Sequence, residues 1–194
     1  PIMTSRGCPY DCHFCSVTGM FGHKYRFRSK ERMIEELRIH KESGGKWVFF
    51  YDDNFAANKK RTKELLREMI AQKLTPRWTA QVRVEIAKDP ELIDLMRRTK
   101  CHTVYIGFES INPATLKAYN KKQGLEDIES CIKMLHKNNI RIHGMFVFGS
   151  DHDTKDTIRE TVRFAKKNKL ESVQFLILTP LPGTNCFWDL ESQP

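Results

Sequence analysis

Three cysteines close together near the start of the sequence most constrain what this chain can fold into. They are Cys8, Cys12 and Cys15, spaced C-x3-C-x2-C. A loop this short can bring three thiolates to one side of a metal centre, and thiolate is a soft ligand that suits iron–sulfur clusters, zinc or Cu(I). In a 4Fe–4S cluster, three local thiolates leave one iron open. Either a distant cysteine supplies the fourth ligand, or the open iron binds a substrate or cofactor.

Two other interpretations of the cysteines stay open at this point. A structural zinc site would add His13 or His23 as the fourth ligand, although C-x3-C departs from the C-x2-C of zinc knuckles. Disulfides are a weaker interpretation, because the sequence shows no signal-peptide pattern and the other cysteines, Cys101, Cys131 and Cys186, are scattered. This usage predicts a reducing compartment, and therefore the cytoplasm.

Length and charge narrow the class further. The chain has 194 residues, of which 40% are hydrophobic, so residues 1–194 can form one domain with a substantial core. It has no apolar run of the roughly 18 residues that a membrane span needs. The net charge of +9 raises the possibility of a nucleic-acid partner. The cations are spread over predicted helices, which is typical of solvated faces and disfavours nucleic acid.

Strand-like apolar runs alternate with helical periodicity, which predicts an α/β fold with a mainly parallel sheet. Strands are expected at 2–5, 47–51, 78–82, 103–108, 142–148 and 173–178. Helices are expected after the capping residues Ser29, Asn58, Asp89 and Asn112, and over 125–136 and 154–167. The last of these is expected to turn Ile158, Val162 and Ala165 inward.

Six β–α units are fewer than the eight that close a TIM barrel. The sequence therefore predicts a partial, three-quarter (βα)6 TIM-like barrel. Both ends look cut, as if a single catalytic core had been excised from or trimmed out of a longer protein. In such barrels the functional residues lie at the carboxyl ends of the strands. Those ends carry polar groups here, at 8–15, 52–53, 81–83, 109–110, 149–151 and 179–180.

The cysteine motif, with the aromatic Phe14 before its last cysteine, resembles the radical S-adenosylmethionine (radical SAM) superfamily. In that family the three cysteines bind a 4Fe–4S cluster, and SAM chelates the open iron. The reduced cluster cleaves SAM to a 5′-deoxyadenosyl radical, which abstracts a hydrogen atom from the substrate. The resemblance implies that Cys8, Cys12 and Cys15 are the cluster ligands and that Phe14 packs near the adenine.

The same resemblance implies an enzyme that modifies a substrate which the sequence does not identify. Methylation, ring formation and rearrangement all fit. Reducing a sulfonium needs a potential near the low end of the range for iron–sulfur clusters, about −700 mV. A flavodoxin- or ferredoxin-type electron donor is therefore implied. The alternative is a zinc-stabilised module that binds nucleic acid.

Later segments resemble other motifs of the family. Tyr51, Asp52 and Asp53 stand where the second-strand SAM motif is found, and they resemble the form seen in members with a cobalamin-binding domain. The acidic residues there would accept hydrogen bonds from the SAM ammonium. The alternative is that Asp53 or Asn54 only makes an Asx-turn.

Gly107 to Ser110 resembles the fourth-strand motif, whose carboxylate, here Glu109, contacts the SAM ribose or amino group. The alternative is that Glu109 pairs with a nearby Arg or Lys. Gly149 belongs to a segment resembling the fifth-strand motif, where glycine lets the backbone approach the adenine. Thr179 to Thr184 resembles a turn of the cobalamin-linked subgroup. Cobalamin itself would bind in the full-length protein, through a domain absent from this chain.

Overall fold

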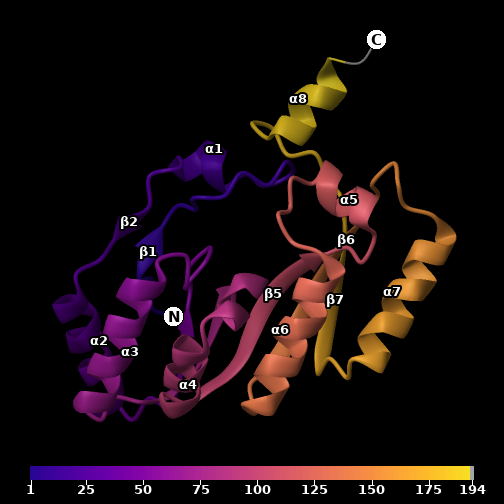
Figure 1. The fold of residues 1–194 in the computed structure, drawn as a ribbon. Coiled ribbons are helices and arrows are strands. Elements are labelled where there is room, and N and C mark those ends of the chain that lie inside the picture. The colour runs from indigo at the N-terminus through magenta and orange to yellow at the C-terminus, as the bar shows by residue number, and fades with distance from the viewer. Residues whose placement is uncertain (193–194) are drawn as a thin grey trace.

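A five-stranded parallel sheet with helices on its outer side forms the framework of the molecule (Figure 1). The computed structural model describes residues 1–192. Strands that follow one another along the chain are neighbours in the sheet, in the order β3–β4–β5–β6–β7. The strands are β3 (Trp47–Phe50), β4 (Arg77–Val82), β5 (Cys101–Glu109), β6 (Arg141–Phe148) and β7 (Ser172–Ile177). The expected α/β, partial-barrel class is confirmed.

Longer helices connect the strands and cover the outer face of the sheet. They are α2 (Lys30–Glu42), α3 (Lys59–Ala71), α4 (Pro90–Arg98), α6 (Leu125–Lys137) and α7 (Lys155–Lys167). Their expected caps are confirmed: for example, the side chain of Asn58 accepts a hydrogen bond from the Arg61 N–H at 3.1 Å, and that of Asp89 accepts one from the Leu92 N–H at 3.0 Å. These contacts satisfy N–H groups that the first helical turn leaves unpaired.

The strand expected at 2–5 is much shorter than predicted. Only Ile2 bridges to the sheet, through its N–H to the Phe49 carbonyl at 2.8 Å and its carbonyl to the Tyr51 N–H at 2.9 Å. The next residues turn away, because the side chain of Asp52 holds Thr4 in place of a backbone partner. Residues Ser5–Arg6 (β1) then pair antiparallel with Arg26–Phe27 (β2). The sixth strand position of the barrel, beside β3, is therefore occupied only by the isolated β-bridge of Ile2 with Phe50.

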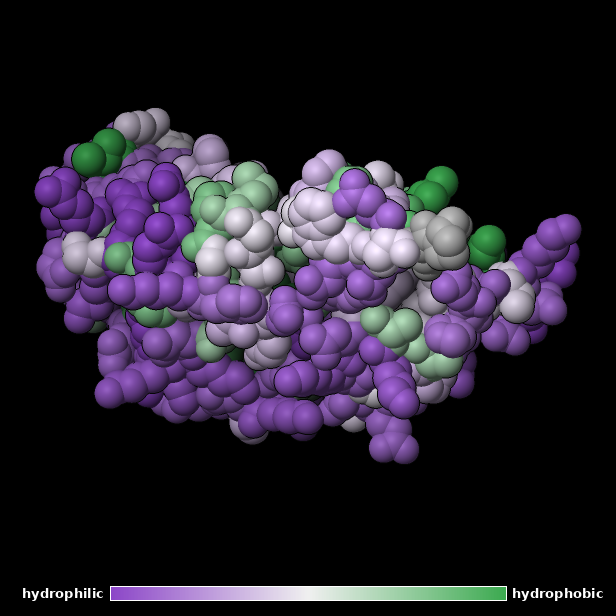
Figure 2. Space-filling view, turned by 90° about the horizontal axis from the view of Figure 1, so that it is seen from above, coloured by the Kyte–Doolittle hydropathy of each residue, from purple (hydrophilic) through white to green (hydrophobic). Residues whose placement is uncertain are grey.

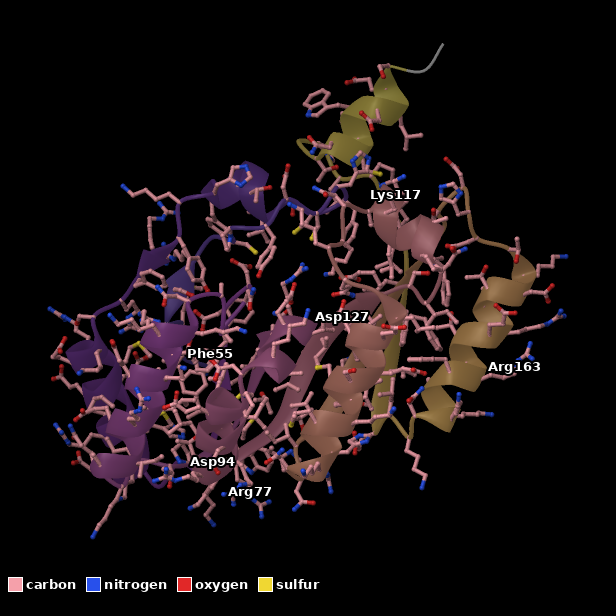
Figure 3. All side chains as sticks on the ribbon, in the orientation of Figure 1. Phe55, Arg77, Asp94, Lys117, Asp127 and Arg163 are labelled. Atoms are coloured by element: carbon pink, nitrogen blue, oxygen red, sulfur yellow. The ribbon has the colours of Figure 1, made fainter. Side chains whose placement is uncertain are left out.

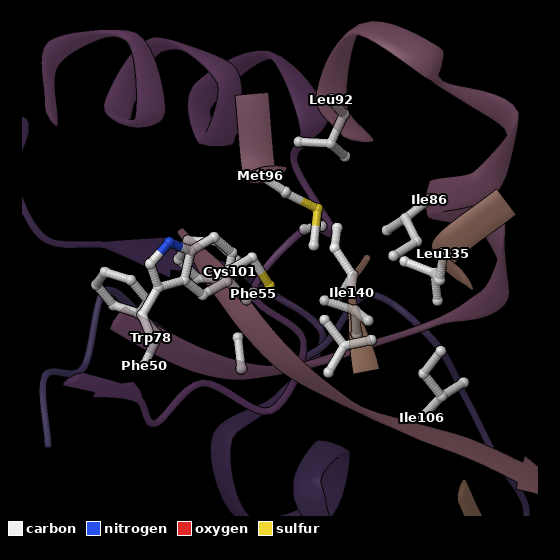
Figure 4. Close-up of a cluster of buried hydrophobic side chains, with 14 of the residues drawn as sticks. Phe50, Phe55, Trp78, Ile86, Leu92, Met96, Cys101, Ile106, Leu135 and Ile140 are labelled. Carbon is white, nitrogen blue, oxygen red and sulfur yellow. The ribbon is translucent and has the colours of Figure 1, made fainter. Parts of the chain in front are cut away.

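The hydrophobic core lies between the sheet and its outer helices. Strand side chains alternate between the two faces, and in β3, β4, β5 and β6 those on the outer face are buried. In the cluster of Figure 4, Phe50 stacks on Phe55 with ring centroids 4.7 Å apart, and Trp78 meets both rings edge-on or tilted at 5.4 Å. The alternate side chains, such as Gln81 and Tyr105, are only partly buried on the inner face. The inner face is therefore free to carry a site.

Helix α7 is rotated from its expected orientation. Ala165 is buried as expected and Val162 is partly buried, but Ile158 is 46% exposed. Thr157, Thr161 and Phe164 are buried instead. Phe164 is the largest apolar side chain of this helix, and its burial carries the adjacent threonines inward.

Short helices lie beyond the carboxyl ends of the strands, at the top of Figure 1. They are α1 (Val17–Phe21), α5 (Pro113–Ala118) and α8 (Asn185–Glu191), and a 3-10 helix, η1 (Val84–Lys88), follows β4. Figure 3 gives the orientation: Lys117 of α5 lies near this end, and Arg77 and Asp94 lie at the opposite edge. Over residues 1–192, none of the helices has both the length and the apolar character that crossing a membrane requires.

Candidate active site

The cysteine loop, residues 8–15, is fixed at the carboxyl end of the sheet by two distant segments. The N–H of His13 donates to the Tyr119 carbonyl at 3.1 Å, and the Asn120 side chain donates to the Asp11 carbonyl at 2.6 Å. From the other side, the Cys186 N–H at the start of α8 donates to the His13 carbonyl at 3.0 Å. The loop is therefore held by α5 and α8 as well as by its own turn. Figure 2 looks down on this end of the molecule.

A pocket of about 170 Å³ opens between the cysteine loop and the inner face of the sheet. It collects residues from the loop and from the ends of β3, β4, β5 and β6. Its lining is Cys8, Cys12, Phe14, Cys15, Val17, Asp53, Asn54, Gln81, Val82, Arg83, Tyr105, Gly107, Glu109, Lys121 and Met145.

All three cysteines of the loop contribute to this pocket. Each is a free thiol of intermediate exposure. Burial raises the pKa of the Cys8 and Cys15 thiols, with a smaller effect in the same direction from the neighbouring Cys12. Cys101, Cys131 and Cys186 are also free thiols but are buried, and none of them lines this pocket.

The donor set fits a 4Fe–4S cluster bound through three thiolates. The three sulfurs come from one short loop and line one shared pocket, and soft sulfur donors are the usual ligands of such clusters. Within residues 1–192, no group of three or more His, Cys, Asp or Glu side chains is gathered as one metal ion would require. His13, a candidate zinc ligand, instead lies 3.2 Å from the carboxylate of Asp189 in α8.

Glu109 enters the pocket through an irregular strand end. The pairing of β5 with β6 shifts between Gly107 and Glu109, and Glu109 has a φ of 63°. This backbone region is costly for a residue with a Cβ, so the surrounding contacts must hold it there. One contact is an ion pair in which the Lys121 ammonium lies 2.7 Å from the Glu109 carboxylate. Gly107 lies beneath the pair, and a Cβ there would collide with the Glu109 carboxylate.

The two aspartates after β3 occupy different places. Asp53 lines the pocket, and burial raises the pKa of its carboxyl group despite a hydrogen bond from the Gly7 backbone. Asp52 is almost fully buried outside the pocket. Its carboxylate accepts from the Thr4 N–H at 3.1 Å, the Thr4 hydroxyl at 2.9 Å and the Ser5 hydroxyl. Asp52 therefore anchors the start of the chain to β3.

Three other residues predicted for the site do not line the pocket. Tyr51 is 55% exposed, and its ring packs on Phe49. Ser110 is buried and accepts a hydrogen bond from the Asn112 N–H at 3.0 Å. Gly149 has a φ of 113° and donates its N–H to the Asp153 carboxylate at 3.0 Å, in the turn after β6. By contrast, Phe14 does line the pocket and meets Tyr119 edge-on at 5.1 Å.

The pocket also contains residues that the sequence interpretation did not assign to it. Gln81, Tyr105 and Met145 lie on the inner face, and their alternation with buried neighbours was a usable signal. Gln81 and Arg83 both stand at the strand end, 81–83, that the sequence analysis identified as polar. Lys121 is one of the spread cations that the sequence analysis interpreted as mostly solvated, yet its side chain is 6% exposed. No feature of the sequence distinguished it.

Comparison with protein families gives one match over most of the chain. The model of the radical SAM superfamily matches residues 2–165.

Similar curated proteins include several methyltransferases. The chain is 36% identical over 197 residues to the bacteriochlorophyllide d C-12(1)-methyltransferase of Chlorobaculum tepidum, covering 100% of this chain and 43% of that protein. It is 38% identical over 189 residues to an uncharacterized methyltransferase of Pyrococcus horikoshii, covering 97% of this chain and 41% of that protein. The chain thus spans less than half the length of these relatives.

Solved structures share the fold. The radical SAM methyltransferase TsrM from Kitasatospora setae, with cobalamin and a 4Fe–4S cluster bound, superposes with a TM-score of 0.87 at 22% identity, covering 95% of this chain and 38% of that one. The cobalamin-dependent SAM radical enzyme OxsB, with aqua-cobalamin and SAM bound, gives a TM-score of 0.78 at 16% identity, covering 98% of this chain and 34% of that one.

Proposed function

Since the chain belongs to the radical SAM superfamily, we propose that it is a catalytic core that holds a 4Fe–4S cluster through Cys8, Cys12 and Cys15 and binds SAM beside it. One observation carries this proposal. The three thiols share a single pocket with the Glu109–Lys121 ion pair, at the carboxyl ends of the strands. Ligands of parallel-barrel enzymes bind at that end.

When bound, the reduced cluster supplies one electron that cleaves SAM into methionine and a 5′-deoxyadenosyl radical. The protein's part is to bind, orient and shield. We assign Asp53 to the SAM ammonium, because its carboxylate lines the pocket after β3. Glu109 would accept hydrogen bonds from the ribose hydroxyls, with Lys121 fixing its orientation. Phe14 offers a ring for the adenine.

The electron donor would be a flavodoxin- or ferredoxin-type protein that approaches the basic segment 24–32. This segment holds Lys24, Arg26, Arg28, Lys30 and Arg32, all exposed, and only one acidic residue. Its first residue lies beside the residue that precedes the cysteine loop, since a Cβ on Gly7 would come within 3.1 Å of the Lys24 carbonyl. A basic surface beside the cluster would steer an acidic carrier.

Charge reversal tests this docking surface. Lys24→Glu with Arg26→Glu should slow cluster reduction by flavodoxin about tenfold or more at low salt, and should leave reduction by dithionite unchanged. The matched control is Lys73→Glu with Lys100→Glu, which reverses two exposed cations before β4 and β5, at the opposite end of the sheet. An equal loss in both double variants would remove the assignment of the donor site to segment 24–32.

For the net reaction we propose methyl transfer that uses cobalamin bound by a domain outside this chain. Support comes from the methyltransferase relatives and from the cobalamin-containing structural neighbours. A second candidate is ring formation, since an anaerobic magnesium-protoporphyrin IX monomethyl ester cyclase of Cereibacter sphaeroides is 29% identical over 193 residues. The substrate is unassigned. The six free thiols and the reductive chemistry favour the cytoplasm.

The experiment uses the full-length protein, reconstituted with iron and sulfide without oxygen and supplied with SAM that carries a labelled methyl group. We expect about four irons per chain, SAM cleavage to 5′-deoxyadenosine, and label in cobalamin when cobalamin is present. Cleavage without label in cobalamin would favour ring formation. A colourless protein with one tightly held zinc, binding nucleic acid, would instead support the zinc-stabilised module.

A further inference from the structure

The guanidinium group of Arg83 faces one of the three cysteine thiols. Arg83 follows β4 directly, is 8% exposed and lines the pocket. Its Nη1 lies 3.7 Å from the Sγ of Cys12, within hydrogen-bonding distance for a sulfur acceptor. Arg83 is the first residue after the strand, so its backbone position is set by the sheet.

Two neighbours fix the orientation of this guanidinium. The carboxylate of Glu85 accepts hydrogen bonds from the Arg83 Nε at 3.1 Å and from Nη2 at 2.9 Å. The ring of Tyr10 lies beneath the plane, with its centroid 3.9 Å from the Arg83 Cζ. A fork that is held on two of its nitrogens and stacked on a ring has little freedom. The remaining nitrogen, Nη1, points to Cys12.

The charge of this group is secure. An arginine side chain stays protonated in proteins, and the Glu85 carboxylate lies 2.9 Å from the Arg83 Nη2. A cation with so little exposed surface is weakly screened by salt. The negative charge of Glu85 cancels part of the electric field of the Arg83 guanidinium. It leaves the N–H groups of Nη1 available to donate to the Cys12 sulfur.

Starting from the proposed function, we propose that Arg83 is a positioning residue that donates a hydrogen bond to the Cys12 ligand and thereby raises the reduction potential of the cluster. Reduction adds one electron from the external donor to the cluster, and no bond is made or broken in that step. The added negative charge spreads onto the sulfurs. A nearby cation and a hydrogen bond to sulfur stabilise the reduced state more than the oxidised one. By raising the very low reduction potential of the cluster, Arg83 would allow a biological electron donor to reduce it.

Lys121 provides a matched comparison, because it is the other nearly buried cation of this pocket. Its ammonium is paired with Glu109 at 2.7 Å, and among residues 1–192 it makes no hydrogen bond to a cysteine sulfur. The two cations should therefore differ in effect. Removing Arg83 should change the potential, and removing Lys121 should mainly change SAM affinity.

The test is a redox titration of the reconstituted full-length protein, followed by the paramagnetic signal of the reduced cluster. Arg83→Met should make the one-electron reduction at least tenfold less favourable, a shift of about 59 mV to lower potential. Arg83→Lys keeps a charge but loses the planar fork, so a smaller shift in the same direction is expected. Lys121→Met should lower the potential less than Arg83→Met does and should weaken SAM binding.

An unchanged potential in both Arg83 variants, together with reduced SAM affinity, would overturn the proposal and make Arg83 a cofactor-binding residue. If the Arg83→Met protein does not take up iron, the reduction potential of the Arg83→Lys protein tests the proposal. A loaded Arg83→Lys protein with the wild-type potential and the wild-type paramagnetic signal contradicts a hydrogen bond that tunes the cluster.

Discussion

The carboxylate of Glu109 and the ammonium of Lys121 form an ion pair at 2.7 Å, and their side chains are only 9% and 6% exposed. The pair forms above Gly107, where β5 shifts its pairing with β6. Lys121 therefore fixes the orientation of the carboxylate that we propose for SAM binding. The expected pairing of Glu109 with a lysine is confirmed, and because Glu109 also lines the pocket, its contact with SAM stays a prediction.

Removing either partner of this pair should damage both stability and SAM binding. Breaking a buried ion pair leaves an uncompensated charge and costs about 3–5 kcal/mol. We expect Glu109→Gln and Lys121→Met each to destabilise the protein, and Glu109→Gln to weaken SAM binding at least tenfold, about 1.4 kcal/mol. Chemical denaturation measures the first effect, and calorimetry of SAM with the clustered protein measures the second.

The double variant Glu109→Gln with Lys121→Met separates the two roles. It leaves no unpaired charge, so it should recover much of the stability without recovering SAM affinity. Iron content should stay at the wild-type level in all three variants. A Glu109→Gln protein with a full cluster and unchanged SAM affinity would contradict the role assigned to the carboxylate.

Gly107→Ala should displace the same pair without removing a charge. The new Cβ would collide with the Glu109 carboxylate and lie 3.2 Å from the Lys121 ammonium. We expect a loss of about 1–3 kcal/mol, typical of overpacking, and weaker SAM binding. Gly124→Ala is the control, since the nearest atom to its Cβ is a carboxylate oxygen at 3.8 Å. Equal losses of stability and SAM affinity in the two variants would show that the collision with the Glu109 carboxylate is not the cause of these losses.

The three loop cysteines should be necessary for the cluster and the other three should not. We expect Cys8→Ala, Cys12→Ala or Cys15→Ala to abolish iron–sulfur incorporation. Alanine at Cys101, Cys131 or Cys186 should leave it intact, because none of these lines the pocket. Iron and sulfide analysis after anaerobic reconstitution measures this. Loss of the cluster in Cys186→Ala would point to a fourth thiolate and remove the open iron.

Asp52 should make stability depend on pH in a predictable direction. Burial raises the pKa of its carboxyl group above 3.8, although hydrogen bonds from Ser5 and Thr4 oppose the rise. The folded state then holds its proton over a range where the unfolded state has lost it. Stability contributed by this group should therefore fall as the pH rises from the unfolded pKa through the folded one, and then level off.

Asp52→Asn carries no such proton, so this part of the pH dependence should vanish. Urea denaturation from about pH 4 to pH 7, which begins near the unfolded pKa, measures the difference between wild type and variant. Glu31→Gln, at an exposed position in the first turn of α2, is the control. If Asp52→Asn and Glu31→Gln changed the pH dependence of stability equally, that dependence would not come from the buried carboxyl group of Asp52.

Local patterns in the sequence predict most of the fold. Strand-like apolar runs locate the five strands, and Ser29, Asn58 and Asp89 cap the helices where expected. The expected strand at 2–5 was wrong in length, because Asp52, 48 positions away from Thr4, takes over its N–H. No local pattern reveals a competition between a backbone and a side-chain partner so far apart in sequence.

The site was predicted less completely, and the reason lies in side-chain direction. Asp52 and Asp53 are adjacent, so they point to opposite sides, and only the structure decides which one meets the pocket. Lys121 looks like any surface lysine until the shift in β5 brings Glu109 against it. Arg83 was recognised as a polar strand end, but its contact with Cys12 depends on Glu85 and Tyr10.

Strand β7 has a practical consequence for handling this chain. Every one of its six residues is exposed, including Val173, Phe175 and Leu176, and Ile177 is 82% exposed. Within residues 1–192 it forms one edge of the sheet, so one side of its backbone has no strand partner. An apolar, unprotected edge is a template for another chain. When the 194-residue chain is purified by itself, it should be prone to aggregate through β7. The substitution Ile177→Lys should reduce this aggregation.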